Sequence, residues 1–147
     1  MEFIVDDETG EHVFLEVNTR LQVEQPVTEA ITGVDLVELM IRVAAGERLS
    51  ITAEQLQFQG HAIEARILAE DTQNNFAPQI GMISQIQVPA DVRWDSGVEA
   101  GSEISPHHDS MSATLIVNGG TADGPLARMR RALDTLRYQR HLQRVHH

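Results

Sequence analysis

In the stretch from Phe14 to Glu24, polar side chains occupy every second position from Glu16 onward. In an extended strand successive side chains point to opposite faces. One face would carry the even-numbered residues Glu16, Asn18, Arg20, Gln22 and Glu24, opposite Val17, Leu21 and Val23. A solvated strand face is one explanation, but this face lacks the Lys, Ser and Thr that commonly fill such surfaces.

These side chains suit two kinds of chemistry. Two carboxylates and an amide oxygen are ligands for a hard cation, and a guanidinium fork binds a small planar oxyanion. At ~3.3 Å per residue, a straight strand would spread the five side chains over roughly 26 Å. They can meet in one site only if the chain bends, and the polar segment 18–26 leaves room for a bend.

The spacing of apolar residues predicts the elements that position this run. Alternation on both sides of Asp6–Gly10 predicts a β-hairpin at the start of the chain. Longer spacing from Val27 to Ala44 predicts a helix with a break at Gly33. A short helical turn is expected around Thr52–Leu56.

The rest of the chain reads as strands followed by one helix. Strands are predicted at residues 60–70, 82–88, 92–99 and 111–117. The last helix is predicted from Thr121 to Tyr138, with its core-facing stripe formed by Leu126, Met129, Leu133 and Leu136. Without a repeating βαβ unit, this order predicts an α+β fold with a mostly antiparallel sheet and flanking helices.

Composition excludes several classes of protein. The chain has 147 residues with 41% apolar residues, enough for one core. A formal net charge of −11 argues against nucleic acid or an anionic membrane surface as partner. The absence of cysteine excludes disulfides and thiolate chemistry. No apolar run approaches a membrane span, and the first ten residues carry no signal-peptide pattern, so we expect a cytoplasmic protein.

The run FLEVNTRLQVEQPVTEAITGVDLVELMIRVAAGE resembles the carboxyl-terminal part of biotin carboxylase, an ATP-grasp component of biotin-dependent carboxylases. Further matches follow in order: GHAIEARILAED at 60–71, Val92-Arg93-Trp94, Asp109-Ser110-Met111 and ARMRRAL at 127–133. The resemblance covers roughly residues 2 to 136. It implies a biotin carboxylase C-terminal domain over 1–136, including the last strands of the ATP-grasp core, and a frayed tail over 137–147.

The resemblance also implies roles for single residues. Glu16 and Asn18 match magnesium ligands, and Glu2 matches an earlier carboxylate that binds metal and an ATP phosphate; Glu16 is likewise assigned to the ATP site. Arg20 matches the catalytic arginine that holds bicarbonate, aided by the Gln22 side chain and the Val23 backbone.

Two further roles concern proton transfer and biotin. Glu24 matches the proposed base that takes the bicarbonate proton, and Arg66 matches the arginine that stabilises the biotin enolate. Glu64 and Arg66 share a strand face, so a surface ion pair between them is the alternative interpretation. His107, His108 and Asp109 suggest a metal cluster, but adjacent strand residues point to opposite faces, which argues against a shared ion. The family usually has aromatic residues there, so the resemblance implies a packing role.

The implied reaction joins bicarbonate, ATP and biotin to give carboxybiotin, ADP and phosphate, by way of carboxyphosphate. Its cofactors are ATP, Mg²⁺ or Mn²⁺, and biotin on a carrier protein or domain. The implied partners are the rest of the biotin carboxylase chain, the biotin carboxyl carrier and the carboxyltransferase components. A homodimer is a further candidate, with Arg93 near the contact.

Two hypotheses remain open from the sequence. In the first, the chain is a fragment of an ATP-dependent biotin carboxylase, inactive alone because the amino-terminal subdomain and the ATP-binding lid are absent; the chain contains no lysine. In the second, it is a non-catalytic remnant or assembly module that retains the fold. Another ATP-grasp ligase is a weaker enzymatic alternative, since such enzymes share the Glu-x-Asn pair but not the whole NTRLQVE run.

Overall fold

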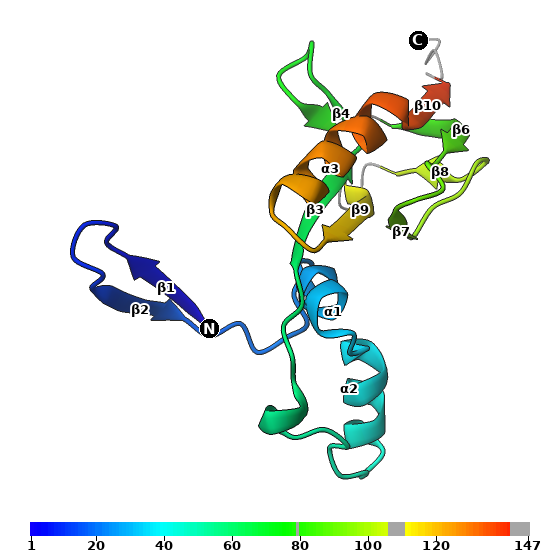
Figure 1. Ribbon diagram of the computed structural model, residues 1–147. Helices are drawn as coiled ribbons and strands as arrows, with labels where there is room; N and C mark the ends of the chain where they lie inside the picture. The colour runs from blue at the N-terminus through cyan, green and yellow to red at the C-terminus, as the bar shows by residue number, and fades with distance from the viewer. Residues whose placement is uncertain (79, 106–110, 142–147) are drawn as a thin grey trace.

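A computed structural model describes residues 1–78, 80–105 and 111–141 of the chain. Figure 1 shows a hairpin that stands apart, a group of helices, and a larger assembly of strands with one helix. The elements in chain order are β1 (Glu2–Val5), β2 (His12–Glu16), α1 (Gln25–Thr32), α2 (Leu36–Ala44), the 3-10 helix η1 (Ala53–Gln55), β3 (His61–Leu68), β4 (Glu70–Asp71), β5 (Ala77–Pro78), β6 (Gly81–Gln87), β7 (Arg93–Ser96), β8 (Glu103–Ile104), β9 (Met111–Gly119), α3 (Asp123–Thr135) and β10 (Arg137–His141).

The predicted opening hairpin is confirmed. Strands β1 and β2 pair antiparallel, with Phe3 opposite Phe14. The turn is held by Asp6, whose Oδ1 accepts hydrogen bonds from the backbone N–H of Glu8 (3.0 Å) and of Thr9 (2.7 Å). These bonds lower the pKa of the Asp6 carboxyl, with the Thr9 N–H as the largest cause. Apolar side chains of both strands are exposed, including Ile4 and Val13 at 58% and 66%.

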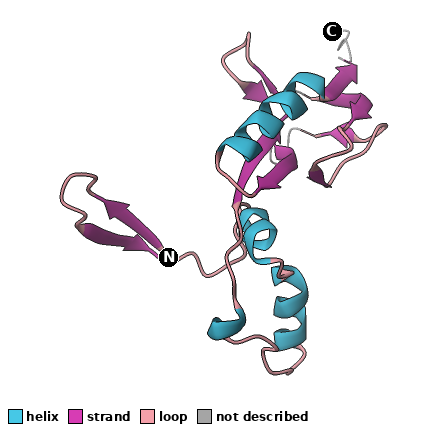
Figure 2. Cartoon of the chain, viewed as in Figure 1, coloured by secondary structure: helices cyan, strands magenta, loops and turns pink. Residues whose placement is uncertain are grey.

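The predicted break at Gly33 separates α1 from α2. Gly33 has a φ of +70° and its N–H donates to the carbonyl of Glu29, which ends α1 in a left-handed turn. Asp35 then caps α2 by accepting a hydrogen bond from the N–H of Glu38 at 2.8 Å. Figure 2 shows these two helices and η1 grouped together, in the lower part of the view.

The main sheet has the order β3-β9-β7 and is antiparallel throughout. One of its faces packs on α3, where Leu115 and Val117 of β9 meet Met129 and Ala132 in the core. A second antiparallel sheet, β10-β6-β8, has its own small core of Ala69, Ile83 and Ile104. The predicted α+β class with mostly antiparallel sheets is therefore confirmed, as are the strands expected near 60–70, 82–88, 92–99 and 111–117.

The predicted core stripe of the last helix is partly wrong. Leu126 and Leu133 are each 45% exposed, whereas Pro125, Met129 and Ala132 are buried. The steps between the buried positions are four and three residues, as on one helix face, and small Ala132 allows close approach to the sheet. Leucine content misled the prediction, because the buried face starts one residue earlier.

The end of the chain also differs from expectation. Residues 137–141, expected to fray, form β10 and pair with β6, with Arg137 opposite Gln87 and Tyr138 opposite Ile86. The expectation is wrong for these residues because Tyr138 packs against the second core. Residues 142–147 and the run His107-His108-Asp109 lie outside the described residues. A domain boundary at residue 136 stays a prediction. In the described part of the chain, no helix has the length and apolar character to span a bilayer.

We expect Gly60→Ala to lower the free energy of unfolding by about 1 kcal/mol or more. Gly60 has a φ of +68°, and an added Cβ would collide with the backbone carbonyl oxygen of Gly119 in β9. Urea denaturation of the purified variants measures the effect. Gly97→Ala is the matched control, because its added Cβ meets no atom within 4 Å. Equal stability of the two variants would contradict this account.

Candidate functional site

The segment 17–24, which joins the hairpin to α1, has no strand structure, and β2 ends at Glu16. The chain therefore bends after the first residue of the polar run, as convergence of the run requires. All eight candidate residues line one cavity of about 540 Å³, together with Met111; they are Glu2, Glu16, Asn18, Arg20, Gln22, Val23, Glu24 and Arg66. Sequence reasoning thus names nearly the whole lining, and the missing member, Met111, belongs to a motif it quoted.

Two of the lining residues are facing carboxylates. Glu2 and Glu16 are directly opposite each other in the hairpin register. Asn18 lies between them, and its Nδ2 donates to Glu2 Oε1 at 2.6 Å and to Glu16 Oε1 at 3.2 Å. Like charges at facing strand positions repel, so the amide offsets only part of an unfavourable arrangement. A cation bound between Glu2 and Glu16 would remove the repulsion between their carboxylates.

The Gln22 amide and the Arg20 guanidinium also line this cavity. Gln22 Nε2 donates to Glu2 Oε1 at 3.3 Å, which ties the bent segment to β1. Within the described part of the chain, Arg20 donates only to the backbone carbonyl of Leu21, at 3.3 Å. Most of the Arg20 donors are therefore available to a small anion.

The cavity lining also contains an ion pair between two residues far apart in sequence. Glu24 precedes α1 and makes no side-chain hydrogen bond to that helix. Its Oε2 instead lies 3.0 Å from Nη2 of Arg66 in β3, and both side chains are about half exposed, at 52% and 50%. A proton on this carboxylate would remove the charge that attracts Arg66 and so weaken the contact.

Arg66 also faces Glu64, the partner that the alternative interpretation gave it. The distance from Arg66 Nε to Glu64 Oε1 is 3.6 Å, longer than the contact with Glu24. The Glu64 side chain is only 7% exposed, so this is not a surface pair. Burial raises the pKa of the Glu64 carboxyl; the Arg66 charge opposes the rise, and the charges of Glu24 and Asp95 add to it.

Sequence reasoning missed the ion pairs that hold α1 on the sheet. Arg93 Nη1 lies 2.7 Å from Glu29 Oε2, and Arg93 Nη2 lies 2.7 Å from Asp95 Oδ2. Glu29 Oε1 also accepts a hydrogen bond from the N–H of Leu36 at 2.8 Å. The hydrogen bonds that Arg93 donates to Asp95 are the largest cause that raises the pKa of Arg93, so its charge is permanent. The spacing Arg93-x-Asp95 on one strand face was the available signal.

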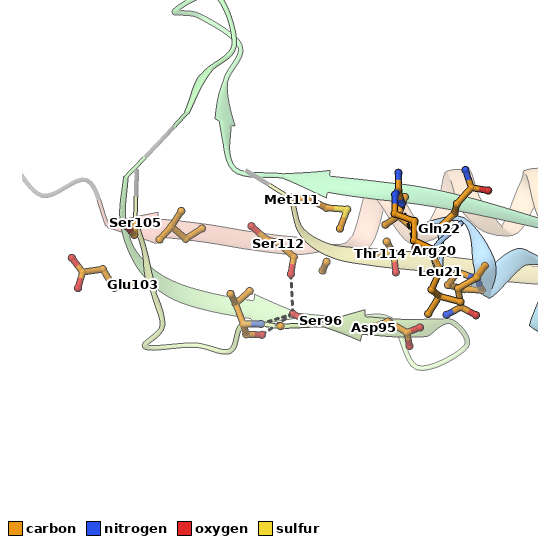
Figure 3. Close-up of a pocket in the computed structure, with 17 residues that line it drawn as sticks. Arg20, Leu21, Gln22, Asp95, Ser96, Glu103, Ser105, Met111, Ser112 and Thr114 are labelled. Atoms are coloured by element: carbon orange, nitrogen blue, oxygen red, sulfur yellow. Dashed lines mark hydrogen bonds between the residues drawn. The ribbon is translucent and has the colours of Figure 1, made fainter. Parts of the chain in front are cut away.

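A second cavity of about 830 Å³ lies next to the first. Arg20, Gln22, Val23 and Met111 line both cavities, so the bent segment forms the wall between them. Figure 3 shows Arg20, Leu21 and Gln22 at one end of the second cavity and Glu103 with Ser105 at the other. No sequence pattern predicted this space, because β7, β8 and β9 form it by tertiary packing.

Comparison with known proteins gives a consistent family. The pattern of the biotin carboxylase C-terminal domain matches residues 64–140, and that of the carbamoyl-phosphate synthase L chain, ATP binding domain, matches residues 1–52. The 2-oxoglutarate carboxylase small subunit of Hydrogenobacter thermophilus is 50% identical over 137 residues, which cover 92% of this chain and 29% of that protein. Biotin carboxylase of Haemophilus influenzae is 48% identical over 128 residues, 86% of this chain and 28% of that protein.

Solved structures give the same family as the sequence matches. The biotin carboxylase domain of the Hydrogenobacter thermophilus 2-oxoglutarate carboxylase, a dimer in complex with MgADP, ADP and bicarbonate, superimposes with a TM-score of 0.87 at 47% identity. The match covers 94% of this chain and 31% of that one. The chain thus spans under a third of the length of these relatives.

We expect Glu64→Gln to leave the protein as stable as the parent at pH 7, or more stable. A raised pKa means that the native state holds the Glu64 proton more tightly than the unfolded chain, whose ordinary value is 4.5. The free energy of unfolding therefore falls as pH rises from about 4.5 through the raised pKa, and the cost of the buried charge is fully present above it. Glutamine carries no such cost.

Urea denaturation at a series of pH values measures this difference, which should shrink as pH falls below the ordinary glutamate range. The exposed Glu99→Gln controls for the loss of one negative charge. A Glu64→Gln protein that is less stable than the parent by the same amount at every pH would show that the carboxylate stabilises the fold.

Proposed function

The chain belongs to the biotin carboxylase family, and from this premise we propose that it supplies the metal-, bicarbonate- and biotin-binding side chains of an ATP-dependent biotin carboxylase site. The observation that carries the proposal is the single cavity that collects all eight candidate residues. In this cavity Asn18 bridges the carboxylates of Glu2 and Glu16, Glu24 pairs with Arg66, and Arg20 has donors left for an anion. Such a lining suits a reaction in which phosphate, bicarbonate and biotin must meet.

The carboxylates of Glu2 and Glu16, with Asn18, suit Mg²⁺ or Mn²⁺. The Asn18 amide lies within hydrogen-bond distance of the carboxylates of Glu2 and Glu16, and a rotated amide would present its oxygen in place of Nδ2. Magnesium is commonly held by one or two carboxylates together with substrate phosphates and water. No group of three or more His, Asp or Glu residues suited to a metal occurs in the described part of the chain. When bound, the ion would neutralise phosphate charge.

Bicarbonate binding is assigned to Arg20 and Gln22. A guanidinium fork matches the planar oxygens of bicarbonate, and the Gln22 amide and Val23 backbone add hydrogen-bonding groups on the same wall of the cavity. Glu24, on the same cavity wall, is proposed as the base that accepts the bicarbonate proton. In this structure the carboxylate pairs with Arg66.

Biotin binding is assigned to Arg66. If the phosphate released from carboxyphosphate took the proton of the ureido nitrogen, negative charge would develop on the ureido oxygen, and a fixed guanidinium would stabilise it. The nitrogen would then form its bond to the carboxyl carbon, whose bond to the phosphate oxygen has broken. Ion pairing with Glu24 alone would explain Arg66 as a structural residue, so the two steps of the reaction must be measured separately.

The groups that hold the ATP triphosphate are proposed to come from other segments of the biotin carboxylase, since this chain contains no lysine. Alone it should show no bicarbonate-dependent ATP cleavage. The biotin carboxyl carrier and the carboxyltransferase components are the proposed partners, with a second copy as a candidate. Arg93, expected near a dimer contact, is engaged by Glu29 and Asp95 of its own chain.

We expect Arg20→Ala and Arg66→Ala to affect different steps in a complete enzyme. Such an enzyme can be built by exchanging the chain for the matching segment of the Hydrogenobacter thermophilus small subunit. Arg20→Ala should lower both ATP cleavage and biotin carboxylation by roughly a hundredfold, because bicarbonate enters both. Arg66→Ala should lower biotin carboxylation by a similar factor, because charge on biotin develops only in that step.

Phosphate release with and without free biotin measures both steps. In Arg66→Ala the slow cleavage of ATP without biotin should remain. Arg130→Ala, an exposed arginine of α3, is the control for loss of one positive charge. Equal losses of both steps together with a lowered unfolding midpoint would make Arg66 a structural residue, and a complete enzyme inactive in every form would favour the assembly-module hypothesis.

We expect Glu16→Gln to weaken Mg²⁺ binding by about tenfold or more while leaving the hairpin folded. The change removes an anionic ligand but keeps the side-chain volume, and relief of the repulsion with Glu2 favours the hairpin. The Mg²⁺ dependence of ATP cleavage in the complete enzyme measures the shift. Glu11→Gln, on the turn of the same hairpin, should leave it unchanged, and an unshifted dependence in Glu16→Gln would show that Glu16 is merely solvated.

A further inference from the structure

Glu64 is a buried carboxylate beside the site, outside the cavity lining. It lies two residues before Arg66 on the same face of β3 and directly opposite Ile116 of β9. Its side chain is 7% exposed, whereas Arg66 is 50% exposed. One of its oxygens, Oε1, lies 3.6 Å from Arg66 Nε. The other, Oε2, is buried and has no hydrogen-bond partner in the described part of the chain.

Stability does not account for this carboxylate. Burial of an ionised group with one oxygen unpaired costs free energy, and a well-packed apolar side chain next to Ile116 would avoid that cost. The charged groups that face Glu64 are Arg66 on its own strand, Glu24 before α1 and Asp95 on β7. Two of these three are like charges, so Arg66 is the one favourable partner among them. A function of Glu64 must therefore run through Arg66.

The three nitrogens of the Arg66 guanidinium have different surroundings. Nη2 contacts Glu24 at 3.0 Å and Nε contacts Glu64 at 3.6 Å. Nη1 has no partner in the described residues and is the nitrogen left for a ligand. The Glu24 contact is exposed and weakens when Glu24 takes a proton from bicarbonate, because the carboxylate then loses its charge. The Glu64 contact is shielded from water and can persist through that exchange.

We propose that Glu64 is a positioning residue, which holds the Arg66 guanidinium in place when Glu24 turns from Arg66 to its proton-transfer role. The proposal rests on the proposed function, in which Arg66 serves biotin and Glu24 serves bicarbonate. A guanidinium held by one buried carboxylate keeps its orientation toward the ureido oxygen, whereas an arginine with no second partner loses it. Orientation of this kind lowers the barrier only of the step in which biotin becomes charged.

A double-mutant cycle in the complete enzyme tests the proposal. Glu64→Gln should lower the biotin-dependent rate by about tenfold and leave ATP cleavage without biotin unchanged. In an Arg66→Gln background the same change should have no further effect, because Glu64 acts through Arg66. Glu99→Gln, which removes one exposed negative charge, should leave both rates unchanged.

The outcomes separate this proposal from the proposed function. If Arg66→Gln spares the biotin-dependent step, the assignment of Arg66 to biotin is wrong. If Arg66→Gln impairs that step but Glu64→Gln does not, or if Glu64→Gln costs the same in both backgrounds, the positioning role is overturned. A Glu64→Gln enzyme that loses both steps and unfolds earlier would also overturn it, in favour of a structural role.

A second measurement is independent of activity. In the 147-residue chain, solvent exchange of the Arg66 Nε–H, followed by ¹⁵N NMR, should be faster in Glu64→Gln than in the parent. The Glu99→Gln protein should match the parent. Unchanged exchange in Glu64→Gln would mean that Glu64 does not hold Arg66, whatever the kinetics show.

Discussion

The layer of alternating charges between α1 and the sheet β3-β9-β7 determines how the site is assembled. Glu24 and Glu29 belong to the α1 side, and Arg66 and Arg93 belong to the sheet. The Glu29–Arg93 pair is largely buried on the glutamate side, at 8% exposure, and fixes the helix. The Glu24–Arg66 pair is half exposed and can open. One layer thus combines a permanent anchor with an exchangeable contact, and the bent segment 17–24 takes its direction from the anchored helix.

Much of this architecture could be predicted from local sequence. The hairpin turn, the Gly33 break and the strand alternation are properties of a few neighbouring residues, and the NTRLQVE run supplies five of the nine residues that line the cavity. Long-range pairing could not be predicted in the same way. Arg93 and Glu29 are 64 residues apart, and nothing in either neighbourhood names the other. The burial of Glu64 depends on Ile116 of β9, and the order of β10 depends on the core that Tyr138 joins.

The errors at the carboxyl end have the same physical origin. Leu126 and Leu133 are apolar but lie on the face of α3 turned from the sheet, because the helix presents Pro125, Met129 and Ala132 instead. Side-chain hydropathy does not fix the rotation of a helix by one residue; the shape of the opposing strand does. The hydropathy pattern of one sequence therefore predicts that the helix exists but assigns the wrong residues to its buried face.

Local stability is unevenly distributed along this chain. The core residues Leu115 and Val117 of β9 are fully buried, whereas the two-stranded hairpin exposes about half or more of Phe3, Val5 and Phe14. A two-stranded ribbon without a covered face is marginally stable in water. Glu2 and Glu16, the proposed metal ligands, lie on the two strands of this hairpin. The affinity for a cation is therefore reduced by the free energy of ordering these strands. Any contact that covers the hairpin would then tighten metal binding without touching a ligand, through conformational entropy alone.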